Sequence, residues 1–305
     1  MPFEEAPSMP PFLHSEMPFH RRAYRLEKGR DKGRLLHFVD HGHRDGQIVV
    51  FFHGNPTWSF LWRKVINALD HDRFRCLAPD LLGLGLSDKW PEVSDHTLER
   101  HQAVLCEWFA ALELKNVILV GQDWGGPMVT GVGAAFSEHI RGVVLGNTSI
   151  LVPRRPRGTA FHRFSHTPLL SDLVFRGLGF PLQVLHRTQG DPASIRGQVA
   201  KAYRWPLQRI KDRAAPLALA RMVPNSPEHP TILPLKRGEE WLRSFEGPLE
   251  LVWGEKDPIL GRALKRHIEV LPKAQVTRTQ AGHFLQEEVP DKLAEAIVRV
   301  TELLS

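Results

Sequence analysis

One aspartate stands where the sequence predicts that a strand, a sharp turn and a helix meet. An apolar, β-branched run from Val117 to Gly121 precedes Asp123, and Gly125 and Gly126 follow it closely. This order is typical of a nucleophile elbow, in which a reactive side chain projects from a strained turn. Small residues beside the turn let the strand and the helix approach closely. We therefore predict that Asp123 is a nucleophile.

Two residues far along the chain are candidate partners of this nucleophile. Asp257 lies in a turn after a predicted strand at 249–253, and His283 follows the last predicted strand. Open α/β sheets collect their functional groups at the carboxyl ends of strands, and the order nucleophile, acid, histidine is known there. The chain has sixteen histidines, and His283 differs from the rest by its position after the last predicted strand. Asn147 ends an earlier strand and cannot act as an anionic acid.

An aspartate nucleophile indicates chemistry at an sp³ carbon. Its carboxylate can displace a leaving group and form an ester, which water can cleave, whereas a serine would form a stable ether. We expect His283, polarised by Asp257, to deprotonate that water. The backbone amides of Trp124 and Asn55 are placed to form the oxyanion hole.

The leaving group needs donors of its own in the first step. Trp124 offers an indole N–H and Asn55 an amide NH₂, and both are neutral. A neutral pair suits a weakly basic anion such as chloride or bromide, so we predict a halide site there. The alternatives are a packing role for Trp124 and a turn role for Asn55, and Trp205 competes as the second donor. We also predict a cis peptide bond before Pro56.

Strands alternating with helices must position these residues. The run Gln47–Phe52 is apolar on both faces, which predicts a central strand covered by helices on both sides. We predict a mostly parallel, eight-stranded α/β sheet. The other predicted strands are Ala23–Lys28, Arg34–Asp40, Phe74–Ala78, one opening at Val117, Ile140–Leu145, Leu249–Trp253 and Gln275–Arg278.

A change in composition after residue 149 divides the chain. Residues 150–228 are rich in Pro, Arg and Phe and give no strand signal, which predicts an inserted helical cap. The remaining segments are an N-terminal arm (1–22), lying on the body or partly disordered, and an α/β core in two parts (23–149 and 229–305). Five apolar cap residues are candidates for either pocket lining or cap core: Phe161, Phe164, Phe175, Leu178 and Phe180.

Composition excludes several classes of function. The net charge of +6 is scattered along the sequence, which argues against nucleic-acid binding. No apolar run approaches the ~20 residues that span a bilayer, so we expect no membrane partner. Two cysteines without zinc-type spacing, and a glycine-punctuated loop at 80–88 that lacks a dinucleotide fingerprint, predict no metal and no cofactor. We expect a cytoplasmic enzyme.

With these residues in view, the chain resembles the haloalkane dehalogenases of the α/β-hydrolase superfamily. The resemblance begins near residue 22 and rests on four stretches, at 53–59, 80–88, 122–127 and 282–283. It implies that Asp123 is the nucleophile, His283 the base and Asp257 its acid. It further implies that Asn55 and Trp124 bind the halide, and that the substrate is a small apolar halogenated molecule attacked with water.

The resemblance extends to finer features. An acid after the seventh strand, combined with Asn55 as the second halide donor, resembles the third subfamily, which tends to oligomerise. A homo-oligomer is therefore a possible assembly. Asp80 belongs to the family pattern as a structural residue.

Three rival functions remain open at this point. An epoxide hydrolase shares the Asp-His-Asp machinery but uses two cap tyrosines, and this chain has only Tyr24 and Tyr203, with Tyr203 alone in the cap. A fluoroacetate dehalogenase would carry Arg at position 124. A non-catalytic binding protein of the same fold is disfavoured because the triad is intact.

Overall fold

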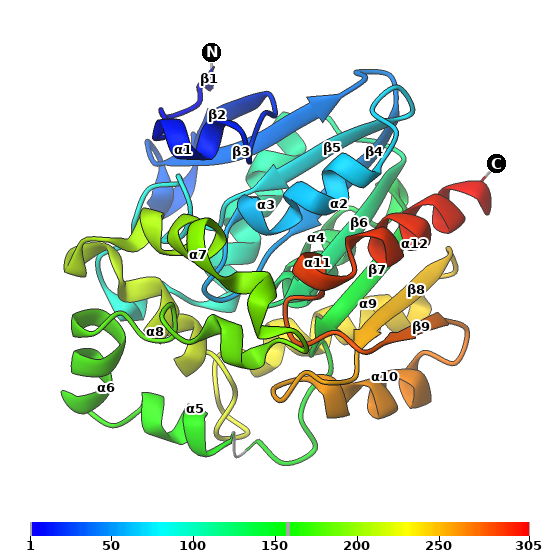
Figure 1. The fold of residues 1–305 in the computed structure, drawn as a ribbon. Helices are drawn as coiled ribbons and strands as arrows, with labels where there is room; N and C mark the ends of the chain where they lie inside the picture. Colours follow the sequence, from blue (N-terminus) through cyan, green and yellow to red (C-terminus); the bar gives the residue numbers. More distant parts are fainter. Residues whose placement is uncertain (1, 157–158, 305) are drawn as a thin grey trace.

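The computed structural model describes residues 2–156 and 159–304, which form a central twisted sheet with helices around it (Figure 1). Nine strands of the described chain make one sheet in the order β1-β2-β3-β5-β4-β6-β7-β8-β9. Strands β4 to β9 run parallel to their neighbours within that group, and β1, β2 and β3 add antiparallel pairs at one edge. Their bounds are β1 Phe3–Glu5, β2 Arg21–Arg25, β3 Leu35–Gly42, β4 Gln47–Phe52, β5 Phe74–Pro79, β6 Val117–Asp123, β7 Ile140–Thr148, β8 Leu249–Gly254 and β9 Gln275–Thr279.

The predicted mostly parallel sheet is confirmed, but its count of eight strands is one too few for the described residues. The additional strand, β1, lies in the N-terminal arm and pairs with β2, so that Phe3 stands opposite Tyr24. A three-residue strand is too short to show a period-2 pattern in sequence. The rest of the arm packs on the body, where Leu13 and Met17 are buried.

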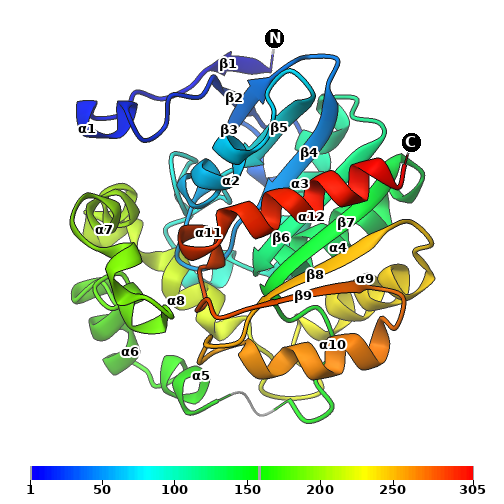
Figure 2. The same ribbon diagram turned by 45° about the vertical axis from the view of Figure 1, so that its right-hand side comes forward.

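Helices cover both faces of the sheet. Helices α2 and α12 contact each other on one face, and α3, α4 and α9 pack together on the other (Figure 2). No helix in the described residues is long and apolar enough to cross a membrane. Outside the cap the helices are α1 Pro11–His14, α2 Arg63–Ala68, α3 Leu98–Ala111, α4 Gly125–Ala135, α9 Ile232–Ser244, α10 Leu264–Val270, α11 Leu285–Glu288 and α12 Pro290–Glu302.

Strand β4 is central, as its two apolar faces predict. It lies between β5 and β6, and its residues from Val49 to Phe52 are fully buried. Strand β6 is likewise buried from Val117 to Gln122. Two neighbouring strands without an exposed face give the loops at their carboxyl ends a rigid support.

The segment between β7 and α9 forms the cap region, next to the carboxyl ends of the parallel strands (Figure 1). It contains α5 (Ala160–Ser165), α6 (Leu170–Asp172), a π-helix (Leu173–Gly177), α7 (Gly197–Arg204) and α8 (Ala214–Arg221). The sequence predicts three short helices here, at 171–178, 193–203 and 212–222, which correspond to α6 with the π-helix, to α7 and to α8. It does not predict α5, whose six residues are too few for a clear helical period. The segment boundaries at 22, 149 and 228 remain predictions.

Three of the five candidate cap residues support the core interpretation. Phe175 is buried with Leu217 and Ala220, and Phe164 and Phe180 pack against this small cluster. The ring of Phe161 lies 5.8 Å from that of Phe175, but 36% of Phe161 is exposed. The core expectation is wrong for Leu178, which directly follows the π-helix and has an exposed side chain.

Candidate active site

Asp123 ends β6 and occupies the strained turn that the sequence predicts. Its φ is 53°, in the left-handed region that residues with a Cβ seldom adopt. The turn closes only because the next residues are small. A Cβ on Gly125 would lie 1.9 Å from the carbonyl oxygen of Phe52, and one on Gly126 would lie 2.0 Å from Thr148 Oγ1.

The loop after β4 approaches the Asp123 carboxyl from the neighbouring strand. The backbone N–H of Asn55 donates to Asp123 Oδ1 at 2.7 Å, and the amide of Trp124 also donates to this carboxyl. A Cβ on Gly54 would lie 2.2 Å from Asp123 Oδ1, so glycine is needed for this approach. Asn55–Pro56 is a cis peptide bond, which confirms the prediction.

His283 connects the other two carboxyl groups. Its Nδ1–H donates to Asp257 Oδ2 at 2.8 Å, and its Nε2 lies 3.6 Å from Asp123 Oδ2. Because a neutral imidazole carries one proton, a proton on Nδ1 leaves Nε2 unprotonated on the side of Asp123, where the Gln122 amide lies 3.4 Å from it. The three residues that the sequence singled out are thus brought together in the arrangement of a base between an acid and a nucleophile.

Burial and charge act on these groups in opposite directions. Burial alone would lower the pKa of His283, but the carboxylates of Asp257 and Asp123 outweigh it and the pKa is raised. Burial would raise the pKa of Asp257, yet His283, Asn147 and the Ile259 amide together hold it below its ordinary value. For Asp123 burial dominates and raises the pKa, against the lowering effect of His283 and the two amides.

The two predicted halide donors adjoin the nucleophile. Trp124 follows it directly, and its indole N–H has no acceptor among the described residues. Asn55 donates one side-chain N–H to the carbonyl oxygen of Pro216 in α8 at 3.0 Å, which leaves its second N–H free. Trp205 instead packs against Trp58, with ring centroids 6.5 Å apart, and lines a surface depression with Arg209.

Comparison with known proteins gives this geometry its context. The chain matches the alpha/beta hydrolase fold family over residues 47–290. A haloalkane dehalogenase of Mycobacterium marinum is 33% identical over 266 residues, which cover 86% of this chain and 87% of that protein. The chain belongs to the haloalkane dehalogenase family.

Solved structures agree with that membership. The haloalkane dehalogenase DatA from Agrobacterium tumefaciens C58 is 27% identical with a TM-score of 0.80, covering 93% of this chain and 97% of that one. The tetrameric haloalkane dehalogenase DpaA from Paraglaciecola agarilytica NO2 has a TM-score of 0.80 at 24% identity and covers 97% of both chains. The second likeness is one of fold.

Sequence reasoning missed two supporting residues in this member of the haloalkane dehalogenase family. Asn147 donates to Asp257 Oδ2 at 2.7 Å and to the Gly254 carbonyl at 3.0 Å, so it orients the acid that it cannot replace. Gln122 donates to the His283 carbonyl at 3.0 Å and fixes the backbone of the base. Both side chains are buried at strand ends beside the triad, and only that position could have indicated them.

Asp80 has the structural role that the family resemblance implies. Its fully buried carboxylate accepts from the amides of Ser59 and Leu86, both at 2.7 Å, and lies 2.8 Å from His37 Nδ1. Burial would raise the pKa of Asp80, but His37, His53 and the Leu86 amide lower it to about 2. The carboxylate thereby ties the 80–88 loop beneath the site.

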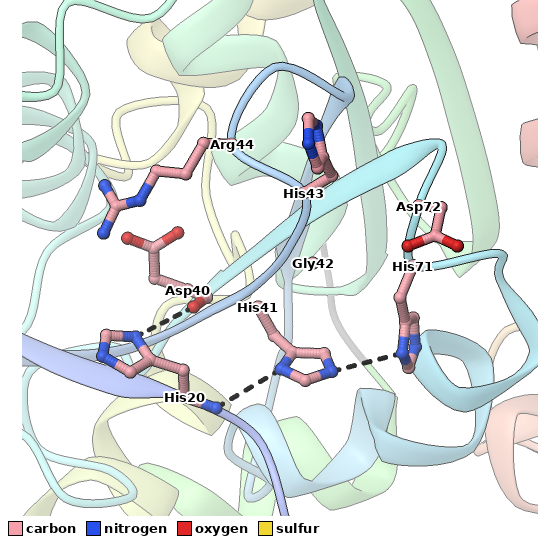
Figure 3. A pocket seen from close by; sticks show the side chains of 8 residues that line it. All are labelled: His20, Asp40, His41, Gly42, His43, Arg44, His71 and Asp72. Carbon is pink, nitrogen blue, oxygen red and sulfur yellow. Dashed lines mark hydrogen bonds between the residues drawn. The ribbon is translucent and has the colours of Figure 1, made fainter.

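A group of histidines at the opposite end of the sheet forms a cluster of titratable side chains outside the site (Figure 3). The backbone N–H of His20 donates to His41 Nδ1 at 3.4 Å, His41 Nε2 then donates to His71 Nδ1 at 3.3 Å, and His71 Nε2 to the Ile66 carbonyl at 2.9 Å. Within residues 2–156 and 159–304, no group of three His, Cys, Asp or Glu side chains could hold a metal ion. The cluster joins the arm to the sheet.

Proposed function

We propose that this protein hydrolyses haloalkanes to an alcohol and a halide through a covalent ester on Asp123. The observation that carries the proposal is the Asp123 carboxyl itself. The Asn55 amide holds Oδ1 and the Trp124 amide donates to the same carboxyl, while Oδ2 lies 3.6 Å from Nε2 of His283. One oxygen is thus held for an oxyanion and the other is left for attack. Family membership supports the same reaction class.

In the first step, Asp123 Oδ2 attacks the sp³ carbon that carries the halogen. The carbon–oxygen bond forms as the carbon–halogen bond breaks, and the halogen leaves with the bonding electron pair as halide. The indole N–H of Trp124 and the free N–H of Asn55 would stabilise the developing negative charge. No proton moves in this step.

In the second step, water attacks the carboxyl carbon of the ester. His283 Nε2 takes a proton from the water as the new bond forms, and the Asn55 and Trp124 amides stabilise the oxyanion on Oδ1. The ester bond then breaks, the alcohol leaves after taking up a proton, and the Asp123 carboxylate returns. Asp257 stabilises the imidazolium that exists between these proton transfers.

Epoxide hydrolysis is the nearest alternative, and both tyrosines of the chain argue against it. The hydroxyl of Tyr203 donates to the buried Glu287 at 2.6 Å, and that of Tyr24 donates to Glu107 at 3.2 Å. Neither is free to protonate an epoxide oxygen. A purely binding role is disfavoured because Asp123, His283 and Asp257 are all present and adjacent.

Three finer assignments belong to the same proposal. An acid at Asp257, with Asn55 as halide donor, supports the third dehalogenase subfamily. A homo-oligomer and a cytoplasmic location remain predictions, testable by light scattering of the purified protein and by cell fractionation.

Halide release tests the proposed reaction directly. Purified protein is incubated with a panel of bromoalkanes and chloroalkanes and, separately, with styrene oxide, with an Asp123→Ala variant as the control. We expect bromide release by the wild type alone, without epoxide opening and without a metal requirement. Dominant epoxide turnover would overturn the assignment of Trp124 and Asn55, and binding without any turnover would favour a non-catalytic protein.

A further inference from the structure

The cap exposes an unusual concentration of leucine side chains. Four of them lie within ten residues and are at least half exposed: Leu169 (85%), Leu170 (50%), Leu173 (58%) and Leu178 (65%), hereafter the leucine patch. Single exposed leucines are normal on a protein surface, but contiguous ones mark interaction sites. In both views the α5–α6 region lies at the edge of the molecule, away from the sheet (Figures 1 and 2).

The local backbone places these side chains together. Leu170 and Leu173 have the i, i+3 spacing of one helical face, and Leu169 directly precedes the helix. Leu178 follows one π-turn later, because its N–H donates to the Leu173 carbonyl. Leu169 has a φ of 61°, which costs free energy for a residue with a Cβ, yet its side chain remains exposed. Packing within the chain therefore does not explain why Leu169 adopts this backbone conformation.

The patch continues onto a second cap segment. The Arg213 guanidinium donates to the carbonyls of Arg176 and Gly177 and also to that of Leu207, which holds the two segments side by side. The 3₁₀-helix Ile210–Asp212 contacts the π-helix, and Ile210 is 60% exposed. Arg209 and Lys211 flank Ile210 in the sequence, so an apolar surface is bordered by basic side chains.

The charge of the whole chain conceals a strong asymmetry. Residues 150–228 contain thirteen Lys and Arg against four Asp and Glu, a net charge of +9, while the remainder of the chain has 27 against 30, a net charge of −3. Several exposed cap residues make no ion pair with a described acidic side chain: Arg155, Arg163, Arg187, Arg196, Arg204 and Lys211. The cap as a whole thus attracts anions.

We propose that this face of the cap docks on an anionic phospholipid bilayer. The leucine patch and Ile210 would enter the boundary between headgroups and acyl chains, while the basic side chains contact lipid phosphates. This is peripheral attachment, which requires no spanning helix. It replaces the expectation of no membrane partner, which rested on spanning segments alone, and it is independent of the reaction at Asp123.

The charge pattern also argues against a second copy of this chain as the occupant. A two-fold interface brings the same patch of each subunit together. Here that would place two basic borders against each other, and like charges across an interface oppose association. An anionic bilayer matches both the apolar centre and the positive border.

Vesicle flotation tests the proposal. The full chain is mixed with vesicles of phosphatidylcholine alone or with phosphatidylglycerol added. We expect flotation with the anionic vesicles only, reduced by added salt because exposed charges are screened. A double variant, Leu169→Asn with Leu173→Gln, should lower the vesicle affinity about tenfold or more. Asn tolerates the positive φ at position 169, so the variant should keep its fold.

Two further variants make the result decisive. Leu233→Gln removes an equally exposed leucine at the start of α9 and should leave flotation unchanged. Arg209→Gln with Lys211→Gln should weaken flotation although the apolar residues are intact. This variant tests the proposal if the leucine variant fails to fold. Absence of wild-type flotation, or flotation of both double variants at the wild-type level, would overturn the proposal. A dimer in solution that the leucine variant abolishes, without vesicle binding, would instead assign the patch to a second copy.

Discussion

Trp124 is one of the two residues on which the proposed choice of leaving group depends. It directly follows the nucleophile, and its indole N–H has no acceptor among the described residues, so a halide can take that place. We predict that Trp124→Phe, which keeps the ring and removes the donor, lowers kcat/KM for bromide release by ~10- to 100-fold, the value of a hydrogen bond to a charged group. Trp205→Phe is the matched control and should change kcat/KM less than about threefold, a factor worth under ~1 kcal/mol. An equal loss in both variants would make Trp205 the second donor.

His283 sets the pH dependence. Its folded-state pKa is raised, and only the neutral imidazole can accept a proton from water. Activity should therefore be lost as pH falls through a value above the ordinary ~6.5 of histidine. In Asp257→Asn, loss of the neighbouring carboxylate should shift the pH at which activity is lost to a lower value and should slow ester hydrolysis. A pH profile of single-turnover hydrolysis measures both effects. Wild-type activity that is lost only well below pH 6.5 would contradict this reasoning.

Among the elements, the turn from β6 into α4 has the least room for a larger side chain. A Cβ at Gly125 would lie 1.9 Å from a backbone oxygen of β4, which cannot move without shifting the sheet. We predict that Gly125→Ala lowers the free energy of unfolding by ~2 kcal/mol or more. Gly177→Ala is the control, since its Cβ would meet only the flexible end of Leu173 at 3.2 Å. Denaturant unfolding of both variants compares them, and similar stabilities would refute this account of the turn.

The predictable elements were those with a strong local signal. Strands β4 and β6 have continuous apolar runs, and α3 has a helical period that begins directly after the capping Thr97. Helix α9 begins at Ile232, because Pro234 is tolerated in a first turn. The residues of the triad were predictable from their positions after strands. The support from Asn147 and Gln122 was not, since distant parts of the chain create those contacts.

At the scale of the whole molecule, the N-terminal arm connects the sheet with the cap. Beyond the β1 pairing, Gln198 of α7 donates to the Phe12 carbonyl at 2.8 Å, and Lys201 lies 4.2 Å from the Phe12 ring centroid. The arm thus contacts both the sheet and the cap. Its sequence lacks periodicity, so composition alone could not distinguish packing from disorder. Four of its apolar side chains are buried: Met9, Leu13, Met17 and Phe19.

Deletion of residues 2–19 should therefore destabilise the protein. Burial of an apolar side chain contributes ~1.5–3 kcal/mol, so we expect a loss of several kcal/mol and a clear fall in Tm. Glu4→Ala is the control, because it removes only the exposed pair with Arg25 and should leave Tm nearly unchanged. Calorimetry of the three proteins makes the comparison, and an unchanged Tm after deletion would show that the arm only rests on the surface.

The covalent ester on Asp123 is the central claim, and a blocked second step tests it most directly. His283→Phe removes the base but leaves the nucleophile, so incubation with a bromoalkane should release one equivalent of bromide and then stop. Mass spectrometry should find the protein heavier by one alkyl group, in the peptide that contains Asp123. Bromide release that continues over many turnovers, or a protein of unchanged mass after release of bromide, would contradict the mechanism.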